Sequence, residues 1–201
     1  PEPEKIVFIA KKLGIDVYKG STHNVLERFY GAAVTEEPDW IVRLTSDCPL
    51  IDPVVIDQVI EHAVEKDFDY VSNTLQATFP DGLDVEVFKY SALQRAVNEA
   101  KLTSETEHVT PYIWKNSSFM GGNIFKSDCV LNHDDLSDIR MNVDTGEDFK
   151  VIEKLIQLLG TEKSWREYVN ILEKNPEIKV LNKHFQRNEG YTKSVDNDKR
   201  G

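Results

Sequence analysis

Strand-like and helix-like periodicities alternate along this chain, and this alternation is the feature that most restricts its fold. Segment 39–45, DWIVRLT, is almost continuously apolar, which is typical of a strand covered on both faces. Asp52 and Pro53 then form a strong helix start. FDYVSN at 68–73 predicts the next strand. Repeated units of this kind favour an α/β protein whose sheet is largely parallel, with helices on both faces.

The same patterns predict the remaining elements. Helices are expected over 6–13, from about Ser21 to 33, over 93–100, after Asp144 and over 165–172, and strands over 15–20, 81–88 and 137–144. From about residue 175 the periodicity fades into polar sequence. We therefore predict an α/β domain over 1–174 and a polar C-terminal extension over 175–201, which would be a mobile tail or lid.

Composition narrows the class of protein. The chain has 201 residues, of which 40% are hydrophobic and 29% charged, as in globular proteins. Its net charge of −11 argues against general binding to nucleic acid or to an anionic membrane. No apolar run is long enough to span a bilayer, and no signal peptide is recognisable. Cys48 and Cys129 lack metal-site spacing and are too few for a disulfide framework, so we expect a reducing, cytoplasmic location.

Two acidic residues follow predicted strands directly. Asp47 comes after WIVRLTS, and Asp144 comes after IRMNV. Ligands of open α/β sheets lie beyond the carboxyl ends of the strands, where Asp47 and Asp144 could share one Mg²⁺ together with substrate phosphates. Helix and turn capping explains the same residues: Asp144 with Glu147 has capping spacing, and Asp47 could cap the turn before Pro49. The pattern alone leaves both interpretations open.

Four segments, in this order, carry a resemblance to a known family. They are VRLTSDCPLIDP, SNTLQATFPDGLDVEVF, SETEHVTPYIW and MNVDTGEDF. Together they resemble the spore-coat polysaccharide branch of the sugar cytidylyltransferases, which is similar to the synthetases of CMP-ketodeoxyoctonate and CMP-sialic acids. The resemblance covers residues 3–159. It implies a Rossmann-like three-layer sandwich of the nucleotide-diphospho-sugar transferase type.

The resemblance also implies an activity. In such enzymes a hydroxyl of a sugar or sugar acid attacks the α-phosphorus of CTP and pyrophosphate leaves, with no protein nucleophile. Asp47 and Asp144 match the two metal-binding segments of the family, so Mg²⁺ is the expected cofactor and surface polysaccharide or glycan assembly the expected process. Similar enzymes often pair as homodimers through an inserted arm, for which 73–84 or 114–132 could serve.

Further residues are candidates for nucleotide binding. Arg28 matches a recurrent Leu-x-Arg of the family and could contact the nucleotide. Gly20 and Ser21, at a turn before a helix, could offer backbone N–H groups to it. An ordinary turn, cap and helix surface explains these three residues equally well.

The expected sugar contacts come from three other segments. Asp81, Asp84 and Glu86 could accept hydrogen bonds from sugar hydroxyls, and Gly82 permits close backbone approach. The competing interpretation is a solvated strand face after a turn. His108 could hydrogen-bond the substrate or be structural. Arg140 could bind a phosphate or a sugar carboxylate, or form an ion pair with Asp138 or Glu147.

The chain departs from the family at its beginning, where the first strand and the triphosphate-binding loop would stand. We therefore expect a sheet that lacks its first strands. Two alternatives stay open: a glycosyltransferase that consumes a nucleotide sugar, and a non-catalytic module that binds a sugar or an enzyme partner. Glycosyltransferases usually carry Asp-x-Asp after a strand. Here that pattern occurs at 67–69 and 196–198, away from predicted strand ends.

Overall fold

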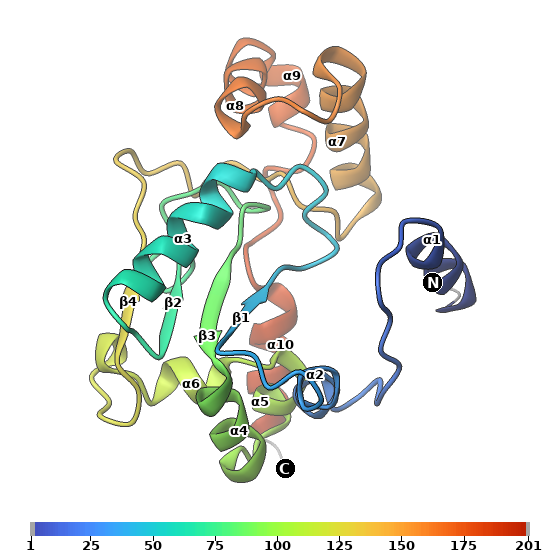
Figure 1. The fold of residues 1–201 in the computed structure, drawn as a ribbon. Coiled ribbons are helices and arrows are strands. Elements are labelled where there is room, and N and C mark those ends of the chain that lie inside the picture. The colour runs from blue at the N-terminus through green and yellow to red at the C-terminus, as the bar shows by residue number, and fades with distance from the viewer. Residues whose placement is uncertain (1–2, 200–201) are drawn as a thin grey trace.

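The protein is described by a computed structural model, in which residues 3–199 are placed. Its sheet has the order β1-β3-β2-β4, formed by β1 (Trp40–Arg43), β2 (Tyr70–Ser72), β3 (Glu86–Lys89) and β4 (Ser127–Cys129). β3 is antiparallel to both of its neighbours, whereas β2 and β4 are parallel. β1, β2 and β4 therefore run in one direction with β3 reversed between them (Figure 1). The α/β class is confirmed, but the sheet is mixed and not largely parallel as predicted, since both pairings of β3 are antiparallel.

Helices cover both faces of this sheet, because successive side chains of each strand point to opposite sides. Val71 and Val87 are paired across β2 and β3 and pack in one apolar core with helix α3 (Pro53–Glu65). Tyr70 and Phe88 form the next pair and pack in a second core, with helices α2 (Val25–Ala33), α4 (Tyr90–Glu99) and α6 (Pro111–Lys115). Val109, directly after α5 (Thr103–His108), belongs to the same core. This arrangement is the expected three-layer sandwich.

The remaining elements lie around the sheet. They are α1 (Pro3–Lys12), the 3₁₀ turn η1 (Ser118–Met120), α7 (Gly146–Leu159), α8 (Trp165–Lys174), α9 (Pro176–Lys179) and α10 (Glu189–Asp198). α7 and α8 complete the core on the α3 side. α1 buries none of its residues, and it stands away from the sheet in Figure 1. Across residues 3–199, every helix is too short or too polar to cross a bilayer.

Two predicted strands were wrong. Residues 15–20 form no strand, and Ile15 and Tyr18 are exposed there, because a strand needs a hydrogen-bonded neighbour that this segment does not have among the described residues. Segment 137–144 forms a single parallel bridge, between Asp81 and Arg140. β4 was missed, since it is only three residues long and polar at two of them.

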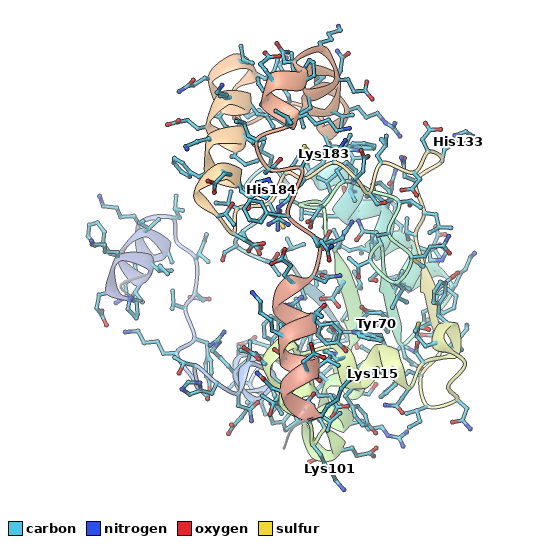
Figure 2. The ribbon with its side chains drawn as sticks, turned by 180° about the vertical axis from the view of Figure 1, so that it is seen from behind. Tyr70, Lys101, Lys115, His133, Lys183 and His184 are labelled. Carbon is cyan, nitrogen blue, oxygen red and sulfur yellow. The ribbon has the colours of Figure 1, made fainter. Side chains whose placement is uncertain are left out.

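The C-terminal segment is folded against the domain. It forms α9 and α10, and α10 packs along α5. Figure 2, seen from behind, shows α10 lying across the domain with Lys115 beside it. Within the described residues, this segment is therefore packed on the domain and is not a separate tail.

Candidate active site

One cavity of about 770 Å³ opens beyond the end of β1, a volume suited to a small molecule. Seven of the predicted site residues line it: Asp47, Asp81, Asp84, Glu86, His108, Arg140 and Asp144. They come from segments far apart in the chain, and the end of β1 and the start of α7 meet at its rim. The structure therefore brings the expected metal and sugar residues into one hollow.

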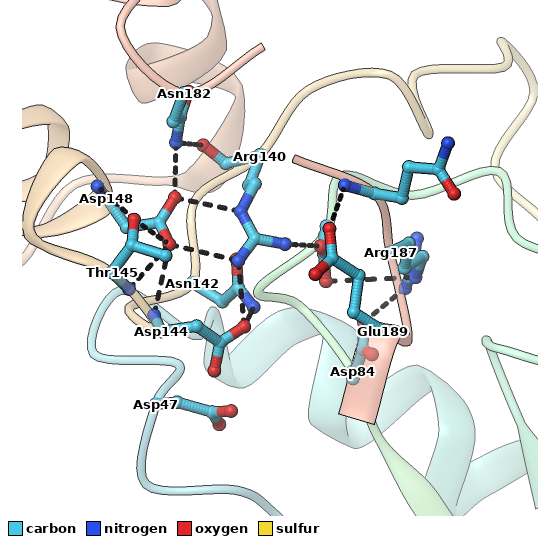
Figure 3. Close-up of polar contacts among 12 residues, drawn as sticks. Asp47, Asp84, Arg140, Asn142, Asp144, Thr145, Asp148, Asn182, Arg187 and Glu189 are labelled. Atoms are coloured by element: carbon cyan, nitrogen blue, oxygen red, sulfur yellow. Dashed lines mark hydrogen bonds and ion pairs between the residues drawn. The ribbon is translucent and has the colours of Figure 1, made fainter. Parts of the chain in front are cut away.

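Asp47 and Asp144 lie side by side at this rim. The backbone N–H of Val143 donates to the carbonyl oxygen of Asp47 at 2.8 Å, which ties the residue before Asp144 to Asp47. Figure 3 shows the Asp144 carboxylate between Arg140 and the Asp47 carboxylate. One oxygen of Asp144 accepts from Arg140 and Asn142, at 2.8 and 2.9 Å. Its other oxygen receives no hydrogen bond from residues 3–199.

The capping interpretation of these two acids was wrong. The N-cap of α7 is Thr145, whose hydroxyl accepts from the N–H of Asp148, while the Asp148 carboxylate accepts from the N–H of Thr145. Asp144 is therefore one residue outside the capping box. Within the described part of the chain, the Asp47 carboxylate accepts only a 3.6 Å contact from the thiol of Cys48. Burial raises the pKa of that thiol to about 12, so it stays neutral.

The donor set fits Mg²⁺ and is incomplete without a substrate. Magnesium is commonly held by one or two carboxylates, with waters and substrate phosphates filling the other positions. Asp47 and Asp144 supply two such carboxylates beside a cavity. Among residues 3–199, no group of three His, Cys, Asp or Glu side chains forms a denser metal site. The residues present match a cation that shares its ligands with a nucleotide.

Arg140 organises the floor of the cavity. Its guanidinium donates to Asp148 at 2.8 and 3.0 Å, to Asp81 at 3.0 Å and to Asp144 at 2.8 Å (Figure 3). Burial opposes ionisation of Asp148, but hydrogen bonds led by Arg140 and Asn182 outweigh it and hold the Asp148 pKa well below its usual range. Arg140 is thus committed to the protein's own carboxylates. The expected pairing with Asp138 or Glu147 is not formed, since Asp138 pairs with Lys179.

Asp81 and Asp84 form the acidic wall next to Arg140. Arg187 pairs with Asp84 and also donates to the carbonyl oxygen of Phe79 at 3.1 Å. Burial raises the pKa of Asp84 to about 6, with Arg187 acting against this and nearby carboxylates adding to it. The pKa of Asp81 is also raised by burial, against the opposing charges of Arg187 and Arg140. This wall therefore presents partly buried carboxylate oxygens that can accept hydrogen bonds.

Glu86 and His108 line the cavity but are held by neighbours. Glu86 pairs with Arg43 and accepts from the hydroxyls of Tyr70 and Thr110, at 2.7 and 2.5 Å. Its side chain is therefore satisfied within the protein. His108 Nε2 lies 3.0 Å from the hydroxyl of Ser194 on α10, and burial lowers the pKa of His108.

Gly82 was predicted to allow close approach of the backbone to the sugar, but it is required for close approach to another backbone segment. It is buried, has φ +110° and does not line the cavity. A Cβ there would lie 2.6 Å from the carbonyl carbon of Met141. The approach is thus to the neighbouring backbone, at the bridge between Asp81 and Arg140.

Gly20, Ser21 and Arg28 are found together but outside the cavity. Ser21 Oγ accepts from the N–H groups of His23 and Asn24, and Arg28 donates to the carbonyl of Ser21 at 2.7 Å. A Cβ on Gly20 would meet the Arg28 side chain at 2.9 Å. These contacts match the turn and helix surface that was the alternative interpretation.

The sequence reading missed the contribution of the C-terminal segment. Asn182 donates to Asp148 at 2.9 Å, Arg187 pairs with Asp84, and Glu189 and Tyr191 line the cavity. Little signal was available, because 180–198 is polar and its partners lie more than 30 residues away in sequence, 103 for Arg187 with Asp84.

Comparison with known proteins gives a consistent picture. Residues 3–188 match the family described as cytidylyltransferase. The chain is 36% identical over 191 residues to an uncharacterized protein of Methanocaldococcus jannaschii, covering 92% of this chain and 74% of that protein. It is 29% identical over 169 residues to the spore coat polysaccharide biosynthesis protein SpsF of Bacillus subtilis, covering 83% of this chain and 68% of SpsF. A solved cytidylyltransferase from Leptospira borgpetersenii superimposes with a TM-score of 0.81 at 34% identity, covering 88% of this chain and 73% of that one.

Proposed function

The chain belongs to the cytidylyltransferase family, a family of nucleotidyltransferase enzymes, and from this premise we propose that it transfers CMP from CTP to a sugar or sugar acid with the help of Mg²⁺. The product would serve surface polysaccharide or glycan assembly, which the likeness to SpsF supports. The observation that carries the proposal is the meeting of Asp47 and Asp144 at the rim of one cavity, joined by the bond between Val143 and Asp47.

Asp47 and Asp144 would hold the cation at the rim. A bound magnesium ion would neutralise phosphate charge and align the nucleotide. Arg140 and Asn142 fix one oxygen of Asp144, which leaves its other oxygen available. Because half of the Asp144 side chain is exposed, 53%, that oxygen can be reached from the cavity.

Asp81 and Asp84 would orient the sugar. Carboxylate oxygens accept hydrogen bonds from hydroxyl groups. The attacking sugar oxygen forms a bond to the α-phosphorus, the bond from that phosphorus to the bridging oxygen breaks, and pyrophosphate departs with the electron pair. The proton of the hydroxyl must leave at the same time. Asp84, whose pKa burial raises to about 6, is a suitable acceptor for it.

Neither alternative function gains support from the geometry. Neither Asp-x-Asp pattern lines the cavity: Asp67 and Asp69 pair with Lys89, and Asp196 and Asp198 lie at the C-terminal end of α10, beyond its cavity-lining residues. A glycosyltransferase would need such a motif beside the nucleotide. A non-catalytic binding module has no need for two adjacent carboxylates at the cavity rim. A homodimer stays a prediction; segment 114–132, one candidate arm, contains β4, which pairs within the sheet.

The test measures pyrophosphate release with each of four nucleoside triphosphates and a panel of sugars and sugar acids. We expect release with CTP and one class of sugar, and none after EDTA treatment. Mn²⁺ binding, followed by electron paramagnetic resonance, gives a readout that does not depend on turnover. Asp47→Asn and Asp144→Asn should abolish both signals, whereas Asp57→Asn, at an exposed position on α3, should change neither. Unchanged Mn²⁺ binding in both site variants would refute the metal assignment.

A further inference from the structure

Three aromatic side chains form an apolar patch on the cavity wall, in contrast to the acidic rim. His108 of α5, Trp114 of α6 and Tyr191 of α10 all line the cavity and are half-buried. The rings of His108 and Tyr191 are 5.3 Å apart at 89°, and those of Trp114 and Tyr191 are 5.8 Å apart at 65°. Edge-to-face contacts of this kind hold each ring in a defined orientation. The patch is therefore an ordered apolar surface inside a polar hollow.

Hydrogen bonds between α10 and α5 fix the position of Tyr191. The Ser194 hydroxyl donates to Glu107 at 2.6 Å, and with its hydrogen used there it accepts from His108 Nε2 at 3.0 Å. One turn further on, Asp198 accepts from the backbone N–H of Ser104 at 3.3 Å. The Lys115 ammonium lies over the Tyr191 ring, 5.8 Å from its centroid (Figure 2 labels Lys115 beside α10). Tyr191 is thus held in place at the cavity wall.

We propose that Tyr191, Trp114 and His108 form a subsite that binds the apolar C–H face of the sugar, so that α10 helps to determine which sugar is accepted. A sugar ring carries hydroxyl groups at its edge and C–H groups on its faces. The carboxylates of Asp81 and Asp84 suit the hydroxyl edge, and the aromatic patch suits a face. The proposal rests on the proposed function for its identification of the ligand as a sugar.

The position of α10 in the chain favours a role in specificity over a role in the shared chemistry. The match to the cytidylyltransferase family ends at residue 188, and α10 begins at Glu189. The metal residues, the acidic wall and Arg140 all lie within the matched part. A wall supplied by an element beyond that part can differ between enzymes that share the same transfer reaction.

The test is saturation-transfer NMR with a panel of neutral sugars and sugar acids, irradiating aromatic protons of the whole chain. We expect transfer to ring C–H protons of at least one sugar. Tyr191→Ala should weaken binding of that sugar about tenfold, as expected for the loss of one ring contact. Tyr191→Phe should bind as the wild type does, and so should Asn197→Ala, at an exposed position of the same helix.

Amide hydrogen exchange of α10 shows whether the helix stays docked in Tyr191→Ala. If the helix is released, Tyr191→Leu, which keeps apolar volume against Trp114, replaces it in the comparison. Unchanged sugar binding in a variant with docked α10 would overturn the subsite, and so would the absence of aromatic transfer to every sugar tested. Pyrophosphate release tests the proposed function separately. Release from CTP can be observed even if Tyr191→Ala leaves sugar binding unchanged, and sugar binding can depend on Tyr191 even if no pyrophosphate is released.

Discussion

Replacement of Arg140 by methionine is the sharpest test of how the cavity is built. The Arg140 side chain is 7% exposed, and two of its three carboxylate partners are also buried: the side chain of Asp148 is 0% exposed and that of Asp81 9%. Methionine would keep much of the apolar volume but remove the charge and all four hydrogen bonds. Asp148 would then be buried without its counter-charge, and Asp81 would keep only Arg187, 3.8 Å away.

The expected cost is about 4 kcal/mol of unfolding free energy at pH 7. Removal of one partner from a buried ion pair typically costs about 3–5 kcal/mol. Asp144 adds little, because its half-exposed side chain recovers contact with water. The penalty should shrink towards pH 4, since an unpaired buried carboxylate gains a proton more readily than a paired one and no longer carries a buried charge.

Urea denaturation followed by tryptophan fluorescence measures this cost. Arg166→Met is the matched control, since Arg166 is exposed, donates to Asn132 at 3.1 Å and lies over the ring of Trp165, so its loss should cost less than about 1 kcal/mol. Asp148→Asn introduced into the Arg140→Met background should recover part of the loss. A free energy for Arg140→Met within about 1 kcal/mol of the wild type would show that the arginine is not the centre of this network.

Two further predictions follow from the acidic wall. Gly82→Ala should destabilise the fold by about 3 kcal/mol, because the new Cβ would lie 2.6 Å from the Met141 backbone, at a residue whose φ is +110°. The control Gly146→Ala should be close to neutral, because nothing lies within 4 Å of its new Cβ. Equal shifts of the melting temperature in the two variants would contradict the argument. Burial raises the pKa of Asp84 to about 6, so the folded protein holds this proton more tightly than the unfolded chain and loses stability as pH rises from about 4 to 6. Asp84→Asn should therefore gain stability relative to the wild type, by about 3 kcal/mol between pH 4 and pH 7.5, and parallel stability curves in urea would disprove it.

The sequence predicted correctly those helix starts that depend only on neighbouring residues. Asp52 is the N-cap of α3, accepting from the N–H of Val54 at 2.9 Å, and Pro53 is its first residue, as expected. The same reasoning could not choose between neighbouring caps before α7, because Asp144 and Thr145 are both good N-cap residues. The choice depends on Asp148, which is placed by the distant Asn182 and by Arg140.

Long-range pairing explains the other failures. Segment 15–20 has strand composition, yet strand formation depends on a neighbour that composition does not reveal. α10 has few apolar residues and no strong periodicity, so its helix is supported by contacts with α5 such as that of Ser194 with His108. The strand pattern singled out Asp47 and Asp144, and the family resemblance favoured a metal role for them over capping. The resemblance contained no information on residues beyond the matched segments.

The arginines explain why the many acids of this cavity have different roles. Arg43 pairs with Glu86, and Arg187 pairs with Asp84. Arg140 pairs with Asp148 and Asp81, so most of the negative charge in the cavity is balanced within the protein. Asp47 has no arginine or lysine partner among the described residues, and Asp144 gives one oxygen to Arg140 and keeps the other free. The uncompensated charge is therefore concentrated at the rim, where two adjacent carboxylates repel each other unless a cation lies between them. A divalent cation relieves that repulsion and still has coordination positions for phosphate, which is why the rim, and not the more acidic interior, is where the nucleotide is expected to bind.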